Sequence, residues 1–338
     1  MKKLKRVSIF IIIVLFVSFA GCAGADSGSG GGGNDAGSAD RPDWGDPVSV
    51  ALLNGPTGIG GALLLTEEMS EYYDVSVFQS PDEIIGKVVT GEVDVAAVPA
   101  NLAAILYNRT EGEVVAFGPI ALGVLYIVQN VNDENEVVTS ISELKGRTIL
   151  AGGKGSTIEH ILDKLLRSSG LDLDSDVEIE WFPSPSDVHA SLVSRPGSIA
   201  MIPEPFVSIA KSRSESVETV LDLNDEWLRA TGSELTMSVL IAQRSFVNDR
   251  NDHVQALLSD FERSIHFINN APEAAALIAE KGFLPNAEVA AKAIPGCNLV
   301  FFQNRQLGAS LLNHFYEILF EIEPRSIGGS LPDEDFYY

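Results

Sequence analysis

Cysteine is nearly missing from this chain of 338 residues, which holds only Cys22 and Cys297. Cys22 lies in the N-terminal leader described below, so Cys297 has no partner for an internal disulfide. A lone thiol is usually a small, buried apolar residue. A disulfide framework and a cysteine-rich metal cluster are therefore both excluded.

Histidine is also scarce, and all five histidines fall in helix-like stretches, where a solvated or hydrogen-bonded ring is the usual finding. They are His160, His189, His253, His266 and His314. No His-x-x-x-His pair suggests a metal site, and Cys297 has no histidine close in sequence to activate it as a nucleophile. We therefore expect no metal, no cofactor and no catalytic residues, and an enzyme is the less favoured class.

Positive charge is limited to 23 Lys and Arg against 47 Asp and Glu, which gives a formal net charge of −24. Nucleic-acid affinity comes largely from Lys and Arg that meet phosphates, so nucleic acid is not an expected partner. Such an acidic surface favours solubility and repels anionic lipid. Adaptation to a salty habitat explains the acidity as well as a role in choosing a partner does.

Long apolar runs are limited to Ile9–Phe19, and none from residue 41 onward is long enough to cross a bilayer. This run follows a basic start and precedes small residues, so residues 1–21 are predicted to be a secretory signal. The sequence Phe-Ala-Gly-Cys resembles the lipobox at which bacterial lipoproteins are cleaved and acylated, here on Cys22. A signal peptide followed by a chance cysteine is the alternative.

Residues 22–46 are mostly Gly, Ser, Ala and Asp, which cannot build a core and predict a flexible tether. Signal, cysteine and tether together predict a domain held at the outer face of a cell membrane by lipid on Cys22 alone. It would face the periplasm or the exterior.

From Pro47 onward, strand-like and helix-like segments alternate, which favours an α/β fold. The first half is expected to hold strands at 48–53, 75–78 and 93–98 and helices at 59–69, 81–91 and 101–107. The second half repeats this order, with strands at 147–151, 177–182 and 198–202 and helices from 157, 185 and 206. Ser80–Glu83 reads as a capping box with proline at the first helical position.

The prolines keep the same register in both halves: 81 and 99 are eighteen residues apart, as are 185 and 203. This repetition predicts two similar lobes. Ligands of parallel α/β sheets bind where strands lead into helix N-termini, so the loops at 54–58, 99–101, 152–157 and 203–206 should line one cleft. Neither the P-loop pattern nor G-x-G-x-x-G fits these loops.

Five segments resemble ABC-importer substrate-binding proteins, in the branch that also holds nitrate, sulfonate, taurine and thiamine-precursor binders. They are NGPTGIGGALLL (54–65), DVAAVPANLAAILYNRT (94–110), GKGSTIEHILDKLL (153–166), IPEPFVSIA (202–210) and SIGGSLPDEDFYY (326–338). The resemblance runs from about Val48 to the C-terminus. It identifies the family more closely than it identifies the ligand.

The resemblance implies a two-lobed type II periplasmic-binding-protein fold with the ligand in the cleft between the lobes. Lobe I would comprise 47–125 and 243–338, and lobe II would comprise 126–242. The chain would cross between the lobes at 122–131 and 235–242. The helix-like stretches 253–269 and 306–322 would then pack on the sheet of lobe I.

The same resemblance implies the ligand-binding positions. They are Asn54, Thr57, Gly58, Pro99, Asn101, Gly155, Ser156, Thr157, Glu204, Pro205 and Phe206. Tyr126 is added to these ligand-binding candidates as an aromatic ring suited to stack on a planar ligand.

Each of these positions also has a purely structural explanation. The hydroxyls of Thr57, Ser156 and Thr157 either reach the ligand or cap helices. Glu204 would suit a bound amine or ring N–H, or it only organises its turn. Aromatic rings, with Tyr126, Phe206 and Trp181 as candidates, either stack on a planar ligand or belong to the core. Lys154 either meets an anion or is solvated.

The ligand class follows from what the cleft loops contain. No arginine pair in them suits a sulfonate or nitrate, and Arg109 and Arg195 are expected at helix ends outside the cleft. A neutral or weakly charged heteroaromatic compound is favoured, such as a pyrimidine, a flavin-like vitamin or a precursor. A nitrate, sulfonate or taurine binder, a ligand-sensing lipoprotein and an enzyme of the same fold are the alternatives.

As a substrate-binding protein of an ABC importer, the chain would have a small-molecule ligand and an ABC permease with its ATPase as partners. The resemblance implies capture of the ligand by hinge closure. We expect the binding protein itself to be a monomer.

Overall fold

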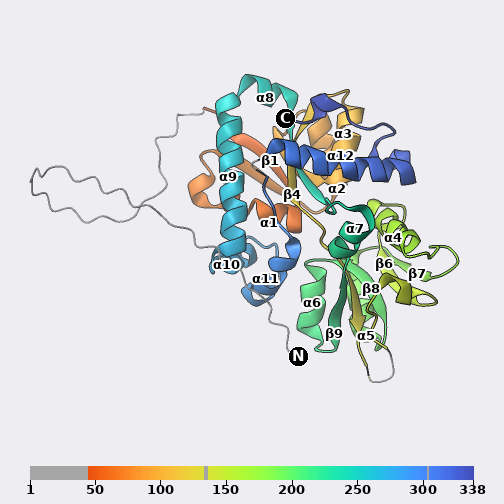
Figure 1. The fold of residues 1–338 in the computed structure, drawn as a ribbon. Helices are drawn as coiled ribbons and strands as arrows, with labels where there is room; N and C mark the ends of the chain where they lie inside the picture. Colours follow the sequence, from red (N-terminus) through yellow and green to blue (C-terminus); the bar gives the residue numbers. More distant parts are fainter. Residues whose placement is uncertain (1–44, 133–135, 303) are drawn as a thin grey trace, which may run out of the picture. The chain divides into compact units, whose positions relative to one another are not determined.

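The computed structural model describes residues 45–132, 136–302 and 304–338. The predicted signal, Cys22 and nearly all of the predicted tether lie outside these ranges. The described chain holds two five-stranded mixed sheets with helices packed against them (Figure 1). The expected α/β class is therefore confirmed.

The first sheet has the strand order β2-β1-β3-β10-β4. Its strands are β1 (Val48–Leu53), β2 (Tyr73–Phe78), β3 (Val95–Pro99), β4 (Val114–Ala121) and β10 (Ser238–Gln243). Strand β1 is parallel to β2 and β3, whereas β10 is antiparallel to β3 and β4.

The second sheet has the order β7-β6-β8-β5-β9 and repeats this pattern. Its strands are β5 (Leu125–Asn130), β6 (Thr148–Gly152), β7 (Glu178–Phe182), β8 (Ile199–Pro203) and β9 (Val217–Asp222). Here β6 is parallel to β7 and β8, and β5 is antiparallel to β8 and β9. The repeated order of elements that the sequence predicted is thus a repeated sheet topology.

Helices follow the strands of both sheets. With the first sheet come α1 (Pro56–Gly60), α2 (Pro81–Val89) and α3 (Ala100–Arg109), and with the second come α4 (Thr157–Ser168), α5 (Pro185–Ser194), α6 (Phe206–Arg213) and α7 (Leu223–Thr231). After β10 come α8 (Arg244–Asp249), α9 (Asn251–Asn270), α10 (Ala274–Glu280), α11 (Ala287–Ala293) and α12 (Arg305–Ile322). Short 3₁₀ turns complete the structure, among them η4 (Pro295–Cys297).

The long helix expected over 59–69 is wrong. The structure has α1 from Pro56 to Gly60, followed by 3₁₀ turns at Ala62–Leu65 and Glu67–Met69. Helix α1 starts early because Pro56 suits the first helical position, and it stops early because Gly60 and Gly61 favour the helix poorly. Close packing also needs one of them, since a Cβ on Gly61 would lie 3.2 Å from the ring of Phe261.

The capping box before α2 is confirmed. The Ser80 hydroxyl accepts a hydrogen bond from the Asp82 amide, and the Glu83 side chain accepts one from the Ser80 amide. The reciprocal pair satisfies backbone donors that the first helical turn leaves open. It fixes the start of α2, which matters because this helix end borders the pocket described below.

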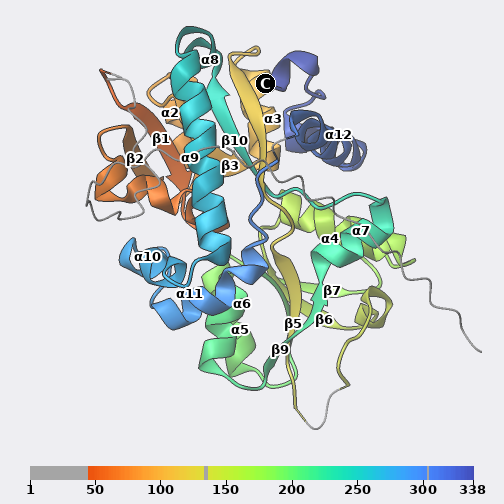
Figure 2. The same ribbon diagram turned by 60° about the vertical axis from the view of Figure 1, so that its left-hand side comes forward.

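Two long helices flank the first sheet, as Figure 2 shows. Helix α9 buries Leu257 and Phe261 in one core cluster with Leu52 of β1. Helix α12 contributes Phe315 and Leu319 to the other main cluster. The expected helical stretches 253–269 and 306–322 are therefore confirmed as helices.

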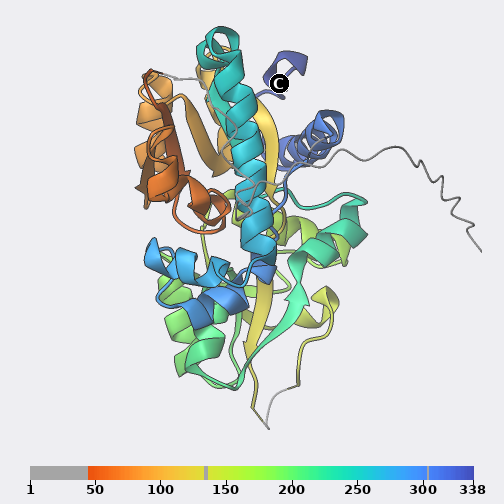
Figure 3. The same cartoon turned by 90° about the vertical axis from the view of Figure 1, so that its left-hand side faces the viewer.

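The pair α10 and α11 lies beside the helices of the second sheet, although it follows β10 in the chain (Figure 3). Helix α11 contacts α6 directly. The segment after it, Asn298–Val300, hydrogen-bonds to the end of β4 and the following residue. The C-terminal part of the chain thus contacts both sheets and the first crossing between them.

Candidate functional site

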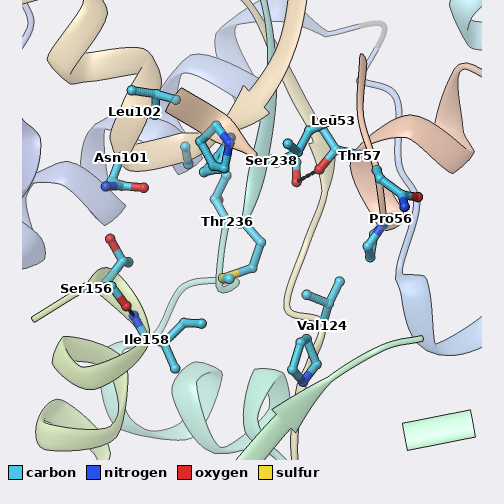
Figure 4. Close-up of a pocket in the computed structure, with 18 of the residues that line it drawn as sticks. Leu53, Pro56, Thr57, Asn101, Leu102, Val124, Ser156, Ile158, Thr236 and Ser238 are labelled. Atoms are coloured by element: carbon cyan, nitrogen blue, oxygen red, sulfur yellow. Dashed lines mark hydrogen bonds between the residues drawn. The ribbon is translucent and has the colours of Figure 1, made fainter. Parts of the chain in front are cut away.

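A pocket of about 490 Å³ lies at the ends of the strands where the loops lead into helices. The first half contributes residues 53–57, 81, 82, 85 and 99–102, and the second half contributes 156–158 and 203–206. The remaining lining residues are 124, 236–238 and 315. Figure 4 shows Asn101 and Ser156 on one side of this pocket and Thr57 on the other. All four loops predicted to line one cleft contribute to it.

Most of the predicted contact residues line this pocket. They are Asn54, Thr57, Pro99, Asn101, Ser156, Thr157, Glu204, Pro205 and Phe206.

Gly58, Tyr126 and Gly155 are not among the lining residues, and neither are Trp181 and Lys154.

Gly58 has a packing role. A Cβ at this position would lie 2.6 Å from both the Leu53 carbonyl oxygen and the Phe283 ring. Gly155 has a turn role, with φ of +75° and its amide bonded to the Glu159 carboxylate. The Tyr126 hydroxyl donates to the Gly296 carbonyl oxygen at 2.9 Å.

Several lining residues had no place among the predicted contacts. The main ones are Val124, Thr236, Met237, Ser238 and Phe315. Residues 236–238 line the pocket because this segment bonds to both the Ala121 carbonyl and the Ala100 amide. The alternation of Thr236 and Ser238 in an otherwise apolar stretch was the available signal for it.

The hydroxyl groups of the pocket differ in their hydrogen bonding. Thr57 Oγ1 and Ser238 Oγ are 3.1 Å apart and share a hydrogen bond (Figure 4). Ser156 Oγ accepts from the Ile158 amide at 3.2 Å and donates to the Gly153 carbonyl, so this residue caps α4. By contrast, the buried hydroxyls of Thr157 and Thr236 have no partner within the described part of the chain.

The two asparagines already have partners. The Asn101 amide donates to the Ser326 carbonyl oxygen at 3.3 Å, and the Asn54 amide donates to the Gln79 side chain at 2.9 Å. Both keep further donor and acceptor positions at the pocket wall, because an amide side chain makes up to four hydrogen bonds.

Glu204 is the buried acid of the pocket and is only 5% exposed. Ser208 in the first turn of α6 donates to both carboxylate oxygens, from its amide at 3.1 Å and from its hydroxyl at 2.9 Å. Burial raises the pKa of Glu204 to about 7, while the bonds from Ser208 and the charge of Lys211 oppose this shift. Ser208 uses two of the roughly four acceptor positions of the carboxylate, so lone pairs remain for a further donor.

The ionisable side chains that line the pocket are acidic. They are the buried Glu204 and the exposed Asp82, with no Lys, Arg or His among the residues that line the pocket. Arg109 and Arg195 lie at the C-terminal ends of α3 and α5, and Arg195 pairs with Glu180 at 2.6 Å. The lining therefore suits a neutral or cationic ligand better than an anion.

The aromatic surface of the pocket comes from Phe206 and Phe315. The ring of His189 lies behind Phe206, with centroids 5.8 Å apart and planes inclined by 31°. Phe315 meets Trp227 edge to face at 5.9 Å. Phe206 is partly exposed and offers an apolar face to a planar ligand, whereas Phe315 is fully buried in the core that forms this part of the wall.

Within the described ranges, no group of three or more His, Cys, Asp or Glu side chains is placed to hold a metal ion. Across the same residues, no helix combines the length and the apolarity needed to cross a membrane.

A family model described as NMT1/THI5-like matches residues 74–275, which is more than half of the chain. The chain belongs to the NMT1/THI5-like family. No curated protein sequence matches it.

Solved structures resemble this NMT1/THI5-like protein over most of its length. An ABC transporter structure from Parabacteroides distasonis aligns with a TM-score of 0.71 and 22% identity, covering 86% of this chain and 98% of that one. The periplasmic aliphatic sulphonate binding protein of Escherichia coli aligns with a TM-score of 0.67 and 20% identity, covering 88% and 92%. The periplasmic nitrate-binding protein of Synechocystis aligns with a TM-score of 0.59 and 11% identity, covering 86% and 83%.

These likenesses establish the two-lobed periplasmic-binding-protein fold. The resemblance stated from the sequence is thereby confirmed at the level of family and fold. Identities of this size carry no ligand from the sulphonate and nitrate binders to this chain.

Proposed function

We propose that this protein is the extracytoplasmic substrate-binding component of an ABC importer and captures a small molecule by hinge closure. The observation that carries the proposal is the pocket of about 490 Å³ lined by matching loops of both sheets. Ligand pockets of this size and position are typical of binding sites between two lobes. The membrane partners would be a permease and its ATPase.

The mechanism rests on differential affinity. A ligand that touches residues of both sheets binds the closed arrangement more tightly than the open one, and so shifts the population toward it. The two connections between the sheets, β4 to β5 and α7 to β10, supply the hinge. The permease would then recognise the closed form.

The lobe boundaries belong to this proposal. The sequence predicted lobe I at 47–125 and 243–338, but β10 (Ser238–Gln243) belongs to the first sheet, so we move the second boundary and propose that lobe I holds 47–125 and 238–338, with lobe II between them. Because β10 pairs with β3 and β4 from Ser238 onward, we place the return to lobe I just before that residue.

The proposed ligand is a neutral or weakly basic heteroaromatic compound such as an aminopyrimidine or a flavin-like vitamin. Glu204 would accept a hydrogen bond from an amine or ring N–H, because its carboxylate is buried at the pocket wall and keeps unused lone pairs. The partly exposed ring of Phe206 would cover a planar face. A sulfonate or nitrate would instead meet a lining without a cationic side chain.

The other proposed contacts are polar groups of the two sheets. Asn54, Thr57 and Asn101 would act from the first, and Ser156 and Thr157 from the second. Thr157 is the strongest of these, since its buried hydroxyl has no partner among the described residues. Ser156 already caps α4, so its ligand contact would be added to that role.

The membrane attachment is proposed from the leader sequence. Acylation of Cys22 after removal of residues 1–21 would place the domain at the outer face of the membrane. The proposal that this protein is not an enzyme agrees with the solved structures that it resembles, which are binding or transport proteins.

A thermal-shift screen tests the function. The chain from residue 41 onward, which keeps every described residue, would be unfolded and refolded to remove carried ligand. The panel would hold thiamine, its aminopyrimidine precursor, riboflavin, nucleobases, nitrate, taurine and alkanesulfonates. Ligand at a hundred times its dissociation constant stabilises by about 2.7 kcal/mol. A response to nitrate or a sulfonate alone would contradict the proposed ligand class.

A further inference from the structure

Gly296 in the turn η4 touches the buried acid of the pocket without lining the pocket itself. A Cβ added to Gly296 would lie 2.9 Å from Glu204 Cγ and 3.0 Å from Glu204 Oε1. Real Cβ atoms essentially never show contacts shorter than 3.0 Å. Glycine at this position therefore leaves just enough space for the carboxylate.

Position 296 requires glycine because of the space around it and not because of its backbone conformation. Gly296 is not among the glycines with positive φ, so any L-residue could adopt its backbone shape. The turn is closed by ordinary means, with the Cys297 amide bonded to the Ile294 carbonyl. The backbone would thus accept an alanine at this position, and the two shortest contacts that oppose it are those with Glu204.

The η4 segment has little freedom to move away. Asn298, which follows it, accepts from the Leu122 amide at 3.0 Å through its carbonyl oxygen, and its side chain donates to the Gly123 carbonyl. Cys297 is fully buried in the core cluster of the first sheet. The segment is thereby fastened to the first crossing and to the core.

Tyr126 closes the remaining side. Its hydroxyl donates to the Gly296 carbonyl oxygen at 2.9 Å, and a Cβ on Gly296 would lie 3.2 Å from that hydroxyl. Glu204 is thus confined between Ser208 of α6, the helix that follows it, and the backbone of η4. Its unused acceptor positions are left to the pocket.

We propose that Gly296 is a positioning residue, which together with Tyr126 holds the Glu204 carboxylate at the pocket wall in the orientation that receives a ligand N–H donor. This inference rests on the proposed function, in which Glu204 contacts the ligand. Glu204 follows β8 of the second sheet, whereas η4 follows β10 and packs on the core of the first sheet. A segment packed on the first sheet therefore sets the orientation of the acid that the second sheet contributes.

The first test measures urea unfolding of ligand-free protein in a double-mutant cycle. Glu204→Ala removes Cγ and Oε1, the two atoms nearest to an alanine side chain at 296, and leaves the Tyr126 hydroxyl at 3.2 Å. Gly296→Ala should therefore lower the urea midpoint in the wild-type background and lose about half or more of that effect in the Glu204→Ala background. An equal effect in both backgrounds would overturn the proposal.

Gly308→Ala is the matched control. Its Cβ, in α12, would lie 3.2 Å from Pro119 Cδ, so it introduces crowding of a similar kind with no contact to an acid. Its effect on the urea midpoint should be the same in the wild-type and Glu204→Ala backgrounds. Coupling of Gly308→Ala to Glu204→Ala would show that the cycle reports general instability, and would overturn the inference.

The second test measures binding of the aminopyrimidine precursor of thiamine by calorimetry across pH 5.5–8.5. Gly296→Ala and Tyr126→Phe should each weaken binding at least about tenfold and shift the midpoint of the pH profile, whereas Gly308→Ala should do neither. Unchanged affinity in Gly296→Ala, with a loss in Glu204→Gln, would overturn the inference and keep the proposed function. Failure of every panel compound to bind wild type would reject the proposed ligand class and leave the unfolding cycle to decide on Gly296.

Discussion

Ser208 donates two hydrogen bonds to Glu204, one from its amide to Oε2 at 3.1 Å and one from its hydroxyl to Oε1 at 2.9 Å. The carboxylate therefore closes the N-terminus of α6 while it also lines the pocket. The two explanations that the sequence left open for Glu204, turn organiser and ligand acceptor, are compatible in this geometry. Experiments on this residue must consequently separate stability from binding.

The stability of the ligand-free protein should depend on pH through Glu204. Its pKa is raised from 4.5 to about 7 by burial, so the folded state favours the protonated acid. The associated stability is fully present below pH 4.5 and is lost as pH rises through about 7. The loss is about 3 kcal/mol. Urea unfolding of wild type and Glu204→Gln between pH 5 and pH 8 measures it.

Glu204→Gln should remove this part of the pH dependence, because the amide does not titrate. The variant should gain stability relative to wild type as pH rises from 5 to 8. Parallel curves for the two proteins over this range would contradict the raised pKa.

The affinity for ligand should also depend on the ionisation of Glu204, but in the direction opposite to that of stability. An N–H donor binds the ionised carboxylate better than the protonated acid, so the affinity for an aminopyrimidine should rise as pH increases through about 7. Glu204→Gln should bind more weakly above pH 7 and lose this dependence. Calorimetry in buffers of different ionisation enthalpy would count the protons released. An affinity independent of pH in wild type would argue that the ligand avoids Glu204.

Most of the fold could be predicted from the sequence, because the signals were local. Alternating strand and helix patterns, the capping box at Ser80 and the paired prolines depend on neighbouring residues. The pocket loops followed from a topological rule about strand ends. The failure at 59–69 has a local cause too, since the glycines there shorten α1 and serve close packing.

The rest of the site depends on residues far apart in the chain. Gly296 meets Glu204 only because η4 is bonded to the first crossing. Thr236 reaches the pocket because the next residue, Met237, is bonded to Ala100 and Ala121 just before β10 begins. Such contacts are set by tertiary packing: the alternation of Thr236 and Ser238 marks that segment as partly polar, but no pattern in the sequence pairs Gly296 with Glu204.

Ser156→Ala should cost the ligand-free protein about 1 kcal/mol of unfolding free energy, because Ser156 caps α4. Ser156→Asp retains a capping oxygen and should restore most of this loss. Thermal unfolding of the two variants measures the cap. A loss of binding that persists in Ser156→Asp would show that the hydroxyl also contacts the ligand, whereas full recovery would assign the residue to the cap alone.

Thr236→Val should leave the ligand-free protein as stable as wild type or stabilise it by up to about 1 kcal/mol. The hydroxyl of Thr236 is buried and has no partner among the described residues, so an apolar side chain of the same shape removes a desolvation cost. Denaturant unfolding measures the change. A loss of more than about 1 kcal/mol would mean that the hydroxyl has a partner in solution, such as a bound water.

His189 should weaken the fold on the acidic side. Burial and the charge of Arg213 lower its pKa below 6.5, so the unfolded chain takes up a proton at a higher pH than the folded protein does. Stability is therefore lost as pH falls from about 6.5 toward the folded pKa, which is opposite in sign to the effect of Glu204. His189→Leu should abolish this loss, and comparing the two proteins at pH 7 and pH 5 isolates it from Glu204.

Protonation of His189 should also affect the pocket, because the His189 ring lies against Phe206. A charged imidazolium needs solvation that this buried position does not supply, so it should disturb the aromatic face that Phe206 offers to a planar ligand. Weaker binding of the aminopyrimidine at pH 5 in wild type than in His189→Leu would show this coupling. Equal binding by the two proteins would confine the effect of His189 to stability.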